Sequence, residues 1–94
     1  MTQYKVLERA TGYGGHQRVY RFPNGFGASV VNGPMLHTFP FHTEIAVLKF
    51  KGKSNEDFSL TYDTPITDDV IITGDEEEEL EYLKEIKALK RGGR

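Results

Sequence analysis

Residues 73–90, with the sequence TGDEEEELEYLKEIKALK, predict an amphipathic helix and thereby decide the fold class. The apolar side chains recur at helical spacing and cover about half of the helical wheel. A helix with one apolar face has to cover another layer of structure. We therefore expect this face to lie on a sheet built from the preceding residues, and its members are Leu80, Tyr82, Leu83, Ile86 and Leu89.

The ends of this helix carry recognisable signals. Two pairs have the spacing of a capping box at the start, namely Thr73 with Glu76 and Asp75 with Glu78. Acidic residues crowd the first turn and basic residues occupy the later turns, which suits the helix dipole at about 0.3–1 kcal/mol for each charge. Gly92 and the glycine after it predict the end of the helix.

Strand patterns fill the chain before the helix. Residues 16–31 predict a β-hairpin, because two alternating runs flank the turn sequence Pro-Asn-Gly at 23–25. Residues 44–50 are apolar on both faces and predict a central strand. Residues 58–62 alternate and predict its partner, with Phe58, Leu60 and Tyr62 pointing inward.

Two shorter segments complete the expected sheet. Residues 4–8 alternate as a strand does, and residues 70–72 are either a last edge strand or a segment packed beneath the helix. We therefore predict one domain over residues 1–94. Its fold is α+β, an antiparallel sheet of four or five strands with one C-terminal helix on one face.

The composition is that of an ordinary globular protein of 94 residues. Cysteine is absent, so disulfides and thiolate metal sites are excluded. The start of the chain does not resemble a signal peptide, and no apolar run is long enough to span a membrane. We expect a cytoplasmic protein.

Charge is strongly segregated along the chain. Residues 1–55 contain seven Lys or Arg and two Asp or Glu, whereas residues 56–94 contain five and twelve. Such a block attracts basic partners and repels nucleic acid. The predicted binding site begins with an acidic surface at the helix start, which consists of Asp75, Glu76, Glu77, Glu78 and Glu79. The plainer alternative is a solvated helix end that the dipole stabilises.

A second candidate is the connector, residues 32–43, which is long for so small a domain. Exposed apolar clusters mark contact sites. The connector therefore predicts an interface, and a homodimer is one way to bury it. Alternatively, its apolar side chains fold back onto the sheet. Its candidate binding residues are Met35, Leu36, His37, Phe39, Phe41 and His42.

No catalytic, metal or cofactor site is predicted. Two histidines in the connector, with no cysteine, fall short of the ligands that zinc needs. Serine residues lack a linked base. Two other functions stay open. Arg18 and Arg21 on a strand with tyrosines could bind nucleic acid, which the acidic helix opposes. Glycine turns and connector histidines could bind a small ligand or nucleotide.

Two stretches resemble a known family. Residues 24–31, NGFGASVV, are similar to an NGYGASVV strand, and residues 63–70, DTPITDDV, resemble a YDTPITDDV ending before an acidic helix. Both occur in small uncharacterised accessory proteins of bacteriophages and prophages, although Phe26 stands where those have tyrosine. The resemblance implies a phage protein in the host cytoplasm. Together with the acidic surface and the connector, it predicts a non-catalytic protein that binds and modulates or inhibits a host macromolecule.

Overall fold

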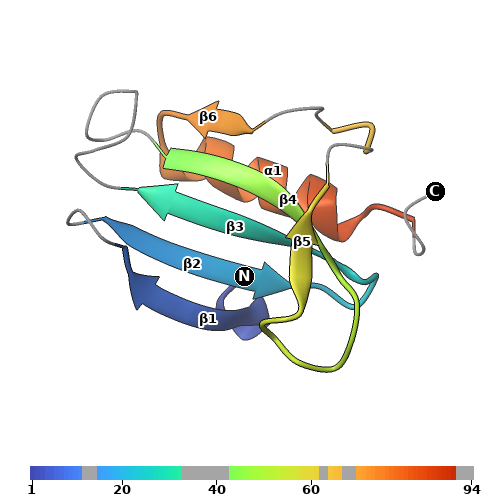
Figure 1. The fold of residues 1–94 in the computed structure, drawn as a ribbon. Coiled ribbons are helices and arrows are strands. Elements are labelled where there is room, and N and C mark those ends of the chain that lie inside the picture. Colours follow the sequence, from blue (N-terminus) through green and yellow to red (C-terminus); the bar gives the residue numbers. More distant parts are fainter. Residues whose placement is uncertain (12–14, 33–42, 62–63, 67–69, 91–94) are drawn as a thin grey trace.

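The computed structural model describes residues 1–11, 15–32, 43–61, 64–66 and 70–90. In these residues an antiparallel sheet is covered on one face by a single α-helix (Figure 1). This confirms the predicted α+β fold and the position of the helix. The elements are a short 3-10 helix Thr2–Tyr4, β1 Lys5–Ala10, β2 His16–Arg21, β3 Phe26–Asn32, β4 Thr43–Phe50, β5 Phe58–Leu60, β6 Ile71–Thr73 and α1 Glu76–Lys87.

The predicted hairpin is present as β2 and β3. Its turn closes with the Gly25 amide donating to the Phe22 carbonyl at 3.1 Å and the Phe22 amide donating to the Phe26 carbonyl at 2.8 Å. Gly25 has a φ of 90°. A side chain is strained in that left-handed region, so the turn requires glycine at this position. The hairpin thus fixes the register of the strands that carry the site.

The predicted central strand is β4, which pairs with β3 on one edge and with two short strands on the other. β5 pairs with residues 48–50 and β6 with residues 43–45, both antiparallel to β4. β5 and β6 therefore lie along the same edge of β4, one beside each end of that strand. Pro65 lies in the chain between them, and proline cannot donate to a ladder. Leu60 is 52% exposed, so the prediction that it points inward and is covered is wrong. It lies opposite Leu48 of β4, but β5 is the last strand at this edge and leaves Leu60 open to solvent.

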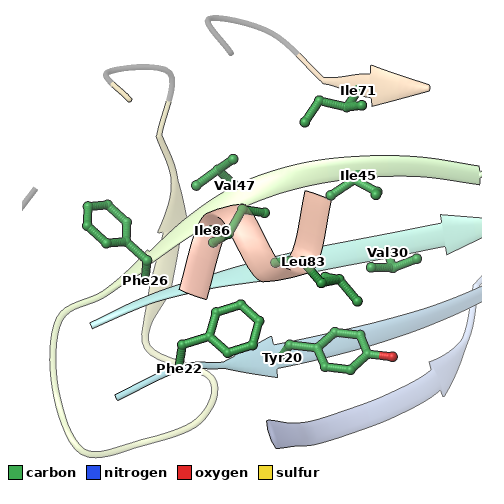
Figure 2. Close-up of a cluster of buried hydrophobic side chains, with 10 residues drawn as sticks. Tyr20, Phe22, Phe26, Val30, Ile45, Val47, Ile71, Leu83 and Ile86 are labelled. Carbon is green, nitrogen blue, oxygen red and sulfur yellow. The ribbon is translucent and has the colours of Figure 1, made fainter. Parts of the chain in front are cut away.

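The sheet packs side chains on both faces. The larger cluster lies between the sheet and α1, where Leu83 and Ile86 meet Val30, Ile45 and Val47 (Figure 2). Val19, Leu48 and Phe50 form a smaller cluster on the opposite face. Burial of each large aliphatic side chain contributes about 1.5–3 kcal/mol. The helix is therefore held to the sheet mainly by its apolar face.

The two ends of α1 are fixed in different ways. Asp75 is the N-cap, because its carboxylate accepts from the Glu78 amide at 2.8 Å, while Glu78 Oε1 accepts from the Gly74 amide at 2.9 Å. The capping box with Asp75 is thus the one used. The sequence predicted that the helix would end at Gly92. In the structure it ends earlier, at Lys87. Asn24 Nδ2 donates to three carbonyls of this end, Ile86, Lys87 and Leu89, each at 2.9 Å.

Candidate functional site

The helix leaves part of the sheet uncovered. α1 packs on β3, β4 and β6, while β1 and β2 lie to one side of it (Figure 1). An open groove of about 940 Å³ follows from this offset, between the N-terminal half of α1 and the first two strands. We call it the groove. Its lining consists of Met1, Thr2, Glu8, His16, Arg18, Tyr20, Asn32, Thr43, Gly74, Asp75, Glu76, Glu77, Glu79, Leu80 and Leu83.

The first wall of the groove is the start of α1. Four of the five predicted residues of the acidic surface meet there, namely Asp75, Glu76, Glu77 and Glu79. Glu78 is exposed and lies outside the lining, and its carboxylate is used in the capping box. The acidic surface thus divides into residues that build the helix end and residues that border the groove.

Arg18 crosses the groove from β2 to the helix. Its guanidinium donates two hydrogen bonds of 3.1 Å to the Glu79 carboxylate and one of 3.0 Å to the Tyr20 hydroxyl. Burial by itself would lower the pKa of Arg18, but the hydrogen bonds and charge of Glu79, with those of Tyr20, outweigh it and raise the pKa above its usual range. Arg18 therefore stays positively charged, and it balances the negative charge of Glu79 within the protein.

The second wall of the groove is formed by β1 and β2. Lys5 Nζ donates to Glu8 Oε1 at 2.5 Å, and His16 Nε2 lies 2.5 Å from Glu8 Oε2. The hydrogen bond from Lys5 and then that from His16 lower the pKa of Glu8 from 4.5 to about 2. Glu8 therefore stays charged at neutral and mildly acidic pH. Its carboxylate adds a negative group on the side of the groove that faces the helix.

The exposed carboxylates of α1 differ in how they are paired. Glu76, Glu77 and Glu85 have no cationic partner among the residues that the structure describes. Glu81 lies 3.9 Å from Lys84, at the limit of an ion pair. The helix therefore presents uncompensated negative charge on the groove and on its outer side.

Arg21 is used to hold the loop between β4 and β5. It donates to the carbonyls of Gly52, Lys53 and Ser54 and to the side chain of Asn55. Its guanidinium also lies 4.7 Å from the centre of the Phe50 ring. Both arginines proposed for nucleic-acid binding thus bond within the protein.

Several groove residues were missed by sequence reasoning, above all Glu8, His16, Tyr20 and Thr43. A signal existed in β2, where His16, Arg18 and Tyr20 alternate and so share a face. No sequence signal shows that the helix would leave this face uncovered, because the offset is a property of the packed layers.

The candidate residues of the connector, from Met35 to His42, lie outside the described residues. An interface or homodimer through the connector stays a prediction. In the described ranges, no three His, Asp or Glu side chains converge as a metal site would require. No helix in those same ranges is both long and apolar enough to cross a membrane.

The chain matches no protein-family model, no curated protein and no solved structure.

Proposed function

We propose that this is a non-catalytic binding protein whose acidic helix face engages a basic partner protein. By its resemblance to phage accessory proteins, the partner would be a protein of the bacterial host, met in the host cytoplasm. Binding would modulate or inhibit the partner by covering a positively charged site. Charged surfaces of this kind steer association and make it sensitive to salt.

One observation carries this proposal, namely the contrast between the acids of α1 and the arginines of β2. Glu76 and Glu77 are exposed and have no cationic partner among the described residues, whereas Arg18 and Arg21 bond to groups of the protein itself. A partner of opposite charge therefore gains interactions at the helix without breaking any in the fold.

The same contrast weakens the nucleic-acid alternative. Phosphate binding needs donors that are free to leave the protein's own acceptors. Arg18 would have to leave Glu79, and Arg21 would have to release the loop that it holds. The small-ligand alternative finds room in the groove, but its open form and charged lining suit a macromolecular partner better.

A pull-down from bacterial lysate tests the proposal. The immobilised protein is expected to retain basic proteins at low salt and release them at high salt. Glu76→Lys with Glu77→Lys should abolish retention, because these changes reverse charge without disturbing the cap or the Arg18–Glu79 pair.

A second variant changes the charge in the opposite direction at two exposed lysines of the loop after β4, Lys51→Glu with Lys53→Glu. It should leave retention unchanged or improve it. Retention that survives reversal of Glu76 and Glu77, or an absence of any retained protein, would refute the proposal.

A further inference from the structure

We propose that the groove is the docking site for a short segment of a basic protein in which arginine alternates with apolar residues. This inference rests on the proposed function and names the surface and the partner chemistry. Three properties of the groove support it: its charge, its apolar floor and a polar side chain, Thr43, at its end.

The charge of the groove is complementary to arginine. Five carboxylates line it, and the basic side chains in its lining are those of Arg18 and His16. They come from both walls, with Glu8 on β1 and Asp75, Glu76, Glu77 and Glu79 at the start of α1. Because Arg18 satisfies Glu79, the carboxylates left for a ligand are mainly Glu76 and Glu77. A carboxylate binds guanidinium through two parallel hydrogen bonds, so arginine fits better than lysine.

The floor of the groove is apolar. Tyr20 is 3% exposed and Leu83 is 1% exposed, and both belong to the main core. Leu80, one turn before Leu83, is 37% exposed and lines the groove. An exposed leucine between carboxylates offers a contact for an apolar side chain or for the aliphatic stem of arginine. This mixture favours an alternating segment over a purely cationic one.

One polar side chain lies at the end of the groove where β3 and β4 meet. Thr43 is only 9% exposed and lines the groove, and its hydroxyl makes no hydrogen bond to the other residues that the structure describes. The Thr43 hydroxyl can therefore accept a hydrogen bond from a bound segment.

The probe for this site is a fluorescein-labelled peptide that alternates arginine and leucine, with both ends blocked. Its affinity is measured by fluorescence anisotropy at low salt. Glu76→Gln with Glu77→Gln changes two carboxylates of the groove, and Glu81→Gln with Glu85→Gln changes two on the outer side of the same helix. Both variants lose two negative charges. A difference between them therefore distinguishes binding in the groove from a general attraction to the negative charge of the protein. Urea unfolding confirms that both are folded.

We expect the groove variant to bind about tenfold more weakly and the outer variant within about twofold of the unaltered protein. Leu80→Ser should weaken binding of the arginine–leucine peptide but not of a peptide with serine in place of leucine. A peptide with glutamate in place of arginine should not bind.

If both glutamine variants lose the same amount of peptide affinity, the proposal that the groove is the docking site is overturned. The proposed acidic binding surface would still stand. The same holds if the peptide fails to bind although basic proteins are retained from lysate. If neither the peptide nor any lysate protein binds, both proposals fail.

Discussion

Asn24 joins the hairpin turn to the end of the helix. Its Oδ1 accepts from the Phe26 amide at 3.0 Å, which shapes the turn, while its Nδ2 donates to the Ile86, Lys87 and Leu89 carbonyls. Two N–H groups thus serve three carbonyls at the end of the helix, of which that of Ile86 also accepts from the Leu89 amide at 3.2 Å. One side chain therefore ties residues that are distant in sequence and sets where α1 ends.

Removing this side chain should destabilise the protein. We expect Asn24→Ala to lower the free energy of unfolding by about 1–3 kcal/mol. Asn24→Asp keeps the acceptor for the Phe26 amide but loses the donors and places a negative charge at the helix C-terminus. It should be destabilised as well, as measured by urea unfolding. An aspartate variant as stable as the unaltered protein would mean that the cap is unimportant.

Glu8 gives the protein a specific response to acid. Its pKa is lowered in the folded state, so its interactions with Lys5 and His16 stabilise the fold fully above pH 4.5. That contribution is lost as the pH falls from 4.5 towards about 2.

NMR titration of the side-chain carboxyl carbon of Glu8 measures this directly. We expect a midpoint near 2, and a shift towards the ordinary value in Lys5→Met. Glu8→Gln should flatten the loss of stability over the same range of pH. A midpoint near 4.5 in the unaltered protein would contradict the described pairing.

At the scale of elements, the faces of α1 have separate tasks. Leu83 is 1% exposed and belongs to the core, whereas Leu80 is 37% exposed and lines the groove. Leu83→Ala should cost about 2–5 kcal/mol of stability. Leu80→Ala should cost less than about 1 kcal/mol and yet weaken binding of the arginine–leucine peptide. Thermal unfolding and anisotropy measure the two effects, and a large stability loss in Leu80→Ala would place this side chain in the core.

The strands and the helix can be predicted from local sequence patterns, but their ends and their exposure cannot. Alternation and helical spacing identify the hairpin, the central strand and α1, because burial on one face repeats with the period of each element. The helix ends earlier than predicted, with Ala88 as its C-cap, and the side chain of Asn24 on a distant turn donates to its last carbonyls. Leu60 faces solvent because β5 lies at the sheet edge, which alternation alone does not reveal.

The site was predicted only in part, because its grouping of residues depends on how the helix and the sheet pack together. Acids at the start of α1 are visible in the sequence, but their grouping with Glu8 and His16 depends on the offset between helix and sheet. The internal use of Arg18 and Arg21 also depends on tertiary contacts. Sequence therefore identifies the charge that is available and not the charge that remains after folding.

At the scale of the whole molecule, the unpaired carboxylates are concentrated at one place. Glu76 and Glu77 border the groove at the start of α1, whereas the exposed lysines of this helix, Lys84 and Lys87, lie in its later turns. The overall charge of −2 does not reveal this local concentration. A basic partner should therefore bind in one orientation, with its arginines towards the groove.

An NMR amide map of the protein, recorded during titration with the arginine–leucine peptide, tests the central claim most directly. We expect the perturbed amides to cluster on both walls of the groove, at Glu8, His16, Arg18 and residues 74–80, and to return to their positions at high salt. Perturbations confined to the outer side of α1 around Glu81 and Glu85, or spread evenly over the protein, would contradict the account.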